Sequence, residues 1–64
     1  MVAIIKKESD DTHIYFKLFI WNGLNYVNID STFIFWDDAY NDDYEFKAIK
    51  DILKRNNINK YQTI

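Results

Sequence analysis

The dipeptide Asn22-Gly23 separates two runs of β-branched and aromatic residues, at positions 12–21 and 24–30. An Asn-Gly pair in this setting is typical of a two-residue type I′ turn, because both central residues of that turn need a positive φ. The sequence therefore predicts an antiparallel hairpin. With a two-residue turn, Trp21 lies opposite Leu24 and Phe16 lies opposite Ile29.

This register divides the hairpin into two faces, because successive side chains of a strand point to opposite sides of the sheet. One face is apolar, and we expect it to form the core: Phe16, Leu18, Ile20, Val27 and Ile29. The other face mixes aromatic rings with polar side chains such as Lys17. Its large apolar members are Tyr15, Phe19, Trp21, Leu24 and Tyr26. A surface of this composition is suited to contact another molecule.

The segment that follows position 43 has the spacing of an amphipathic helix. Its apolar stripe consists of Phe46, Ile49, Ile52 and Leu53. Lysine, arginine and aspartate residues occupy the opposite arc. We expect this stripe to cover the core face of the hairpin.

Both ends of this helix have recognisable signals. Asp42 and Glu45 have the spacing of a capping box, so the helix is expected to begin near Asp43. Asn57 is suited to the left-handed position that follows a helix, and Ile58 would then contact the last turn in a Schellman motif.

Three other segments have strand character. Residues 2–5 are a short β-prone run, and residues 33–36 form either a third strand of the meander or a corner that leads to the helix. Residues 61–64 could return as a short edge strand. We therefore predict a single domain over residues 1–64 with an α+β fold: a small antiparallel sheet of three to four strands packed on one C-terminal amphipathic helix.

Composition excludes several classes of site. The chain has no cysteine, one histidine and one glycine, so thiolate metal sites, sites with several imidazoles and glycine-rich phosphate loops are not expected. No cofactor is implied. No apolar run approaches the ~20 residues of a membrane-spanning helix, and there is no signal-peptide pattern. We expect a protein of the cytoplasm, or of the host cytoplasm if the chain is viral.

Charge is segregated along the second half of the chain. Residues 30–45 hold six acids and no base, whereas residues 46–60 hold five bases and one acid. Acids before a helix and bases in its last turns favour the helix dipole, which explains much of this pattern. The acidic positions Asp37, Asp38, Asp42 and Asp43 could also act as a contact that imitates nucleic-acid phosphates. Their adjacent pairs lack the alternate spacing and the glycine of a calcium loop.

Catalysis has little support. His13 has no cysteine partner, and the two serines, Ser9 and Ser31, fall in predicted turns, so no nucleophilic triad is expected. We predict a non-enzymatic protein.

The leading functional prediction is a small protein-binding module that uses the aromatic face. Tryptophan and tyrosine often dominate protein interfaces, and a self-complementary face would also permit a homodimer. Asn, Ile, Lys and Tyr supply 29 of the 64 residues, a bias typical of low-GC genomes. We therefore expect a stoichiometric regulator or inhibitor of the kind that a phage or mobile element carries. The alternative is a single-stranded nucleic-acid-binding protein whose aromatic strand residues stack on bases; the net charge of −2 disfavours it.

Overall fold

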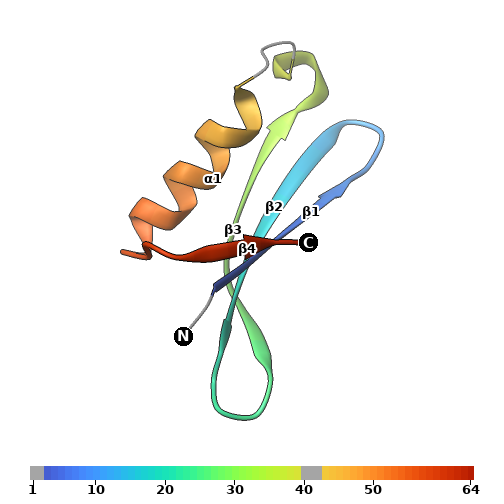
Figure 1. Cartoon of the computed structure of the whole chain (residues 1–64). Helices are drawn as coiled ribbons and strands as arrows, with labels where there is room; N and C mark the ends of the chain where they lie inside the picture. Colours follow the sequence, from blue (N-terminus) through green and yellow to red (C-terminus); the bar gives the residue numbers. More distant parts are fainter. Residues whose placement is uncertain (1–2, 40–42) are drawn as a thin grey trace.

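The computed structural model describes residues 3–39 and 43–64, which form a four-stranded sheet and one helix (Figure 1). The elements in chain order are β1 (Ala3–Ser9), β2 (His13–Trp21), β3 (Tyr26–Phe35), a 3-10 turn η1 (Trp36–Asp38), α1 (Tyr44–Arg55) and β4 (Tyr61–Thr63). The predicted α+β class is confirmed.

The strand order across the sheet is β3-β2-β1-β4. Strands β1, β2 and β3 form the antiparallel meander that the turn signals predict. Residues 61–63 do form a final strand, and β4 pairs with β1 in the parallel direction. The sheet is therefore mixed, because the chain crosses over through α1 and returns at the edge opposite β3.

The core lies between α1 and one face of the sheet. The sheet contributes Ala3 and Ile5 from β1, together with Ile14, Phe16 and Leu18 from β2. The helix contributes Ala48, Ile49, Ile52 and Leu53. Phe16 and Leu18 were predicted to be buried, and both are fully buried.

The C-terminal end of α1 is the predicted Schellman motif. Asn57 has a φ of 57°, and its N–H donates to the Lys54 carbonyl at 3.1 Å. The Ile58 N–H donates to the Leu53 carbonyl at 2.9 Å. These two bonds satisfy carbonyls that the end of a helix would otherwise leave without donors.

The N-terminal end of α1 is tied to the sheet. Asp43 is the residue before the first helical position, and its side chain makes no capping hydrogen bond. The Glu45 carboxylate accepts from Lys7 Nζ of β1 at 3.1 Å, and this bond raises the pKa of Lys7. Asp42, the other member of the predicted capping box, lies outside the described residues.

The hairpin register differs from the prediction because the turn has four residues rather than two. Trp21 pairs with Tyr26, and the Asn22 N–H donates to the Asn25 carbonyl at 3.0 Å. Asn22 Oδ1 also accepts from the N–H groups of Leu24 and Asn25. Among the described residues only Gly23 and Asn57 have a positive φ, so the type I′ turn is not formed. Instead, the Asn22 side chain accepts the backbone hydrogen bonds of a four-residue loop.

A β-bulge changes the register a second time. Phe19 pairs with Asn28, whereas Leu18 pairs with Asp30. Ile29 is therefore the extra residue. Beyond the bulge Phe16 lies opposite Thr32, not opposite Ile29, and β3 continues through residues 33–35 as a third strand before η1 forms the corner. The two structures predicted as alternatives for residues 33–36 therefore both occur: residues 33–35 end the strand, and Trp36 begins the corner.

Three residues that were predicted to be core are exposed. Val27 and Ile29 are exposed because the end of the hairpin extends past α1, so no helix covers it (Figure 1). Ile20, the partner of Val27, is partly buried against the core. Phe46 is 64% exposed, since α1 packs mainly on β2 and β3 and turns this position away from them. Ala48 takes its place in the buried stripe.

Candidate functional site: the open sheet face

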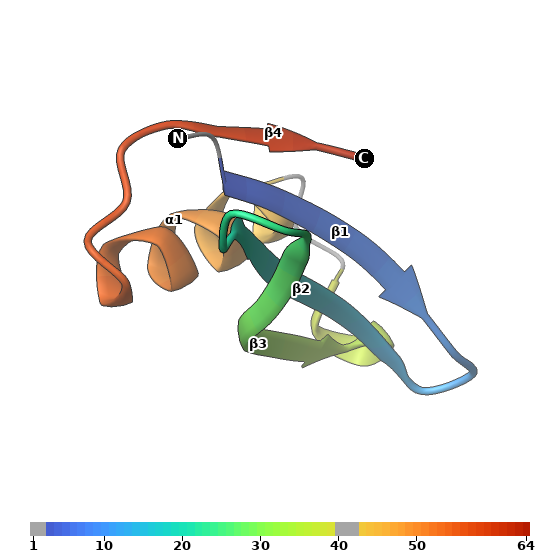
Figure 2. The ribbon, with the colours of Figure 1, turned by 90° about the horizontal axis from the view of Figure 1, so that it is seen from below.

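The sheet face opposite α1 is not covered by any described element. Figures 1 and 2 show α1 on one side of the sheet and no second layer on the other side. We refer to this side as the open face. It carries the side chains of β1, β2 and β3 that alternate with the core residues, and most of its large apolar members lie on β2 and β3.

One aromatic cluster lies at the turn end of the open face. This hairpin-end cluster consists of Phe19, Trp21 and Tyr26. The rings of Trp21 and Tyr26 meet edge to face, with their centroids 5.2 Å apart. Phe19 and Tyr26 also line a hollow of about 230 Å³ together with Ile4, Lys6 and Ile64. The apolar surface therefore continues from the hairpin across β1 to the C-terminal residue.

A second cluster lies at the other end of the same face. This His13 cluster consists of His13, Tyr15, Phe33 and Phe35. Tyr15 lies opposite Phe33 and His13 lies opposite Phe35. The closest rings are those of His13 and Phe35, whose centroids are 4.6 Å apart. Phe33 and Phe35 meet edge to face at 5.7 Å.

A row of charges separates the two clusters. Glu8 accepts from Lys17 at 2.6 Å and from Lys6 at 3.4 Å. The bonds from Lys17 and then Lys6 lower the pKa of Glu8, so the carboxylate is ionised at neutral pH. Both lysines of this row therefore already have an anionic partner within the chain.

The His13 cluster is held in place by Asp10 in the β1–β2 turn. Asp10 Oδ1 accepts from the N–H groups of Thr12 and His13 at 2.9 and 2.7 Å, and Asp10 Oδ2 accepts from the Tyr15 hydroxyl at 3.1 Å. The two backbone bonds lower the pKa of Asp10 to about 2. The hydrogen bond to Asp10 raises the pKa of Tyr15. These bonds position the rings of the His13 cluster.

The surroundings of His13 do not form a catalytic triad. The Thr12 hydroxyl lies 2.5 Å from His13 Nδ1, and Asp10 Oδ1 lies 3.7 Å from the same nitrogen. A triad needs the nucleophile and the carboxylate on opposite ring nitrogens, so that the imidazole can pass a proton between them. Here both groups approach one nitrogen.

The structure places four of the five predicted patch residues on the open face. Trp21 and Tyr26 are brought into contact, and Phe19 lies in the same cluster. Tyr15 lies in the separate His13 cluster. Leu24 is in the turn, where it is 85% exposed and belongs to neither cluster.

The prediction missed Phe33 and Phe35, which are 51% and 49% exposed on this face. Their spacing of two positions was a sign that they share one side of a strand. Which side of the sheet the two rings face depends on the bulge at Ile29, because one extra residue moves every later side chain of the strand to the opposite face.

The acidic positions are dispersed. Asp37 and Asp38 are exposed in η1, and Asp37 lines a hollow with His13 and Phe35 at the border of the open face. Asp43 pairs with Lys47 at 3.5 Å, one turn along α1. Asp42 lies outside the described residues.

The described residues contain no group of three or more His, Asp or Glu side chains close enough to hold a metal ion. Within residues 3–39 and 43–64 there is also no helix with the length and hydrophobicity required to cross a membrane.

Comparison of the chain with protein-family models, with curated proteins and with solved structures found no match.

Proposed function

We propose that this chain is a non-enzymatic protein-binding module whose open face is the interface. The observation that carries the proposal is the aromatic exposure of one uncovered sheet face: Trp21, Tyr26, Phe33 and Phe35 are each 41–51% exposed there. In a domain of this size, that much exposed aromatic surface is typical of a site that another molecule covers.

The arrangement of the face supports a protein partner. Two aromatic clusters flank the charged row of Lys6, Glu8 and Lys17, so a partner would meet large rings at both ends and polar groups between them. Rings such as those of Trp21 and Tyr26 supply much contact area with few rotatable bonds, which is why they often dominate binding energy.

The partner is either a second copy of the chain or a target protein of the host cell. A second copy would form a two-fold dimer through the same face. With a host target, the chain would act stoichiometrically as a regulator or inhibitor of the phage or mobile-element type, in the cytoplasm. Asp37, at the border of the face, would supply an acidic contact beside the His13 cluster.

Single-stranded nucleic acid is the other candidate ligand for exposed rings. It receives less support, because Lys6 and Lys17 both pair with Glu8 and the chain has a net charge of −2. A nucleic-acid site needs cations that are available to phosphates.

The proposal is tested by Phe33→Ala and Tyr26→Ala, which remove rings from the two clusters. Val27→Ala is the matched control, because Val27 is exposed on the same strand but shares its side of the sheet with Ile20. Sedimentation velocity gives the oligomeric state of all four proteins. We expect wild type and Val27→Ala to form a dimer that Phe33→Ala and Tyr26→Ala weaken at least tenfold.

If wild type is a monomer, the same four proteins are used to capture partners from the native host. The expected result is a protein that wild type and Val27→Ala retain and that Phe33→Ala loses, with binding reproduced by the purified partner. A monomer whose captured proteins are the same for the wild type and all three variants would overturn the proposal. Salt-sensitive quenching of tryptophan fluorescence by a single-stranded oligonucleotide would overturn it in favour of the nucleic-acid alternative.

A further inference from the structure

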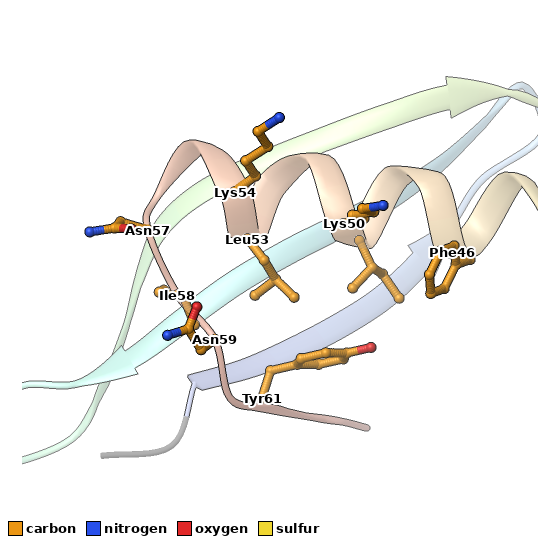
Figure 3. Close-up of a pocket in the computed structure, with 9 residues that line it drawn as sticks. Phe46, Lys50, Leu53, Lys54, Asn57, Ile58, Asn59 and Tyr61 are labelled. Carbon is orange, nitrogen blue, oxygen red and sulfur yellow. The ribbon is translucent and has the colours of Figure 1, made fainter.

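A groove on the helix side of the sheet lies between α1 and β4, away from the open face. It has a volume of about 420 Å³, within the range of sites that hold small molecules. Figure 3 shows Phe46 and Leu53 of α1 on one side of it and Tyr61 of β4 on the other. The groove exists because α1 packs mainly on β3 and β2, which leaves the side of the helix that faces β4 uncovered.

Two aromatic rings line this groove. Phe46 is 64% exposed and Tyr61 is 39% exposed. Neither ring stacks on another aromatic ring among the described residues. Ile49 and Leu53 supply apolar side chains beside them. Since aromatic rings attract one another edge to face or offset, both rings are free to contact an aromatic ring of a ligand.

The rim of the groove is cationic. Lys50 lies there, with Nζ 5.9 Å from the centre of the Phe46 ring, whereas Lys54 points away from the groove in Figure 3. None of the nine lining residues is acidic. Among the described residues, no carboxylate pairs with Lys50. An ammonium group at the rim of an apolar groove, without a carboxylate partner in this part of the chain, favours a ligand with a negative charge.

We infer that this groove binds a small aromatic carboxylate. The ring of the ligand lies between Phe46 and Tyr61, against the apolar side chains of Ile49 and Leu53. Its carboxylate points out of the groove and pairs with Lys50. One small molecule meets both requirements, because the cation is at the rim and the apolar side chains lie below it. The site is separate from the open face, so the inference goes beyond the protein-binding function proposed above.

The probes are three compounds that separate the ring from the charge. Cinnamate carries both, cinnamamide carries the ring without the charge, and hexanoate carries the charge without a ring. Each is titrated into the ¹⁵N-labelled full chain. We expect cinnamate to shift the backbone N–H signals of Phe46, Lys50 and Tyr61 most. It should bind about fivefold more tightly than cinnamamide, since an exposed ion pair contributes little, and about tenfold more tightly than hexanoate.

Two lysines of α1 allow a matched test of the charge. Lys50→Gln should weaken cinnamate binding about fivefold and should make cinnamate and cinnamamide bind equally, because the carboxylate has lost its partner. Lys47→Gln is the control, since Lys47 pairs with Asp43 and does not line the groove. It should change the affinity by less than about twofold.

Phe46→Ala tests the contact with the ring. Most of this side chain is exposed, so we expect the variant to fold and to bind cinnamate about tenfold more weakly. A circular dichroism melt that matches wild type verifies the fold. Phe33→Ala, which tests the open face, should bind cinnamate as wild type does, so the two proposals can fail separately.

Several results would overturn the inference. These are no shifts up to the solubility limit of cinnamate, shifts centred on the open face, or equal affinity of the wild type for cinnamate and cinnamamide. Hexanoate that binds as tightly as cinnamate would overturn the aromatic assignment and show that the groove accepts apolar anions in general.

Discussion

Asp30 is the residue that joins β3 to α1. The bulge at Ile29 places Asp30 opposite Leu18. Its carboxylate then accepts two bonds from Arg55, from Nε and from Nη2, each at 3.0 Å, and a third from Asn56 Nδ2 at 2.7 Å. Bidentate pairs of this kind are stronger than single contacts between neutral groups.

Replacing Asp30 tests this connection. We expect Asp30→Asn to lower the free energy of unfolding at pH 7 by about 1 kcal/mol, a modest value because Arg55 is half-exposed and water screens the pair. Asp51→Asn is the control, since Asp51 pairs with the same Arg55 but is exposed and one helical turn away. It should change stability by less than about 0.5 kcal/mol in urea unfolding followed by tryptophan fluorescence.

The same carboxylate predicts a dependence of stability on pH. The bonds from Arg55 and then Asn56 lower the pKa of Asp30 from its ordinary 3.8 to about 2. A lowered pKa in the folded state means that the stabilisation is complete above the unfolded pKa and is lost as the pH falls towards the folded one. Between about pH 4 and pH 2, wild type should therefore lose stability more steeply than Asp30→Asn. Equal slopes in urea titrations over this range would contradict the assignment.

Among the secondary-structure elements, the C-terminal end of α1 depends most on the identity of a single residue. Asn57 holds a φ of 57° in the Schellman motif. A side chain with a Cβ is strained in this conformation, asparagine less than most, and glycine is not strained.

We expect Asn57→Gly to raise the melting temperature and Asn57→Ala to lower stability by about 1 kcal/mol, a shift of about 4–8 °C in a domain of this size. Asn59, which does not have a positive φ, is the control position. Asn59→Gly should not stabilise the chain, because there glycine only adds freedom to the unfolded state. Circular dichroism melts of the three variants measure these differences.

The elements also show where prediction from the sequence succeeded. The strands, α1 and its C-terminal motif were predicted, because each depends on residues within a few positions of one another. The four-residue turn at Asn22 and the bulge at Ile29 were not. An Asn-Gly pair is compatible with two kinds of turn: a two-residue turn in which the Asn backbone has a positive φ, and a longer turn in which the Asn side chain accepts backbone hydrogen bonds. The second kind is formed here, because Asn22 Oδ1 accepts from the N–H groups of Leu24 and Asn25.

At the scale of the whole molecule, the core is a thin layer in a body of 38 × 22 × 17 Å. Among the residues that the structure describes, it consists of nine buried residues, drawn from α1 and one face of the sheet. Small domains bury a modest share of their surface and have little stability to lose. Single core substitutions should therefore have global effects.

Two apolar residues of α1, Ile52 and Phe46, show how the cost of a substitution depends on burial. Ile52→Ala removes a fully buried side chain and is expected to cost about 2–5 kcal/mol, enough to unfold much of the population. Phe46→Ala removes a larger but mostly exposed ring, and we expect a change below about 0.5 kcal/mol. Far-ultraviolet circular dichroism and urea unfolding distinguish the two. Equal losses would show that the apolar stripe read from the sequence, and not the packing of α1, describes the core.

The aromatic residues of the open face were only partly predictable, because the side of the sheet on which they lie depends on the turn and on the bulge. Trp21, Tyr26 and Phe19 were placed correctly because a turn of two residues and a turn of four leave them on the same side of the sheet. Phe33 and Phe35 lie beyond the bulge, and their side could not be read from local alternation.

The sequence by itself determined the α+β class, the hairpin around Asn22-Gly23, the helix and its left-handed end at Asn57. These follow from backbone preferences and side-chain periodicity over short stretches of chain. Only the tertiary structure decided the bulge at Ile29, the parallel pairing of β4 with β1, and which apolar residues remain exposed. Those features depend on contacts between distant segments, such as Asp30 with Arg55, and on how far one short helix can extend over a longer sheet.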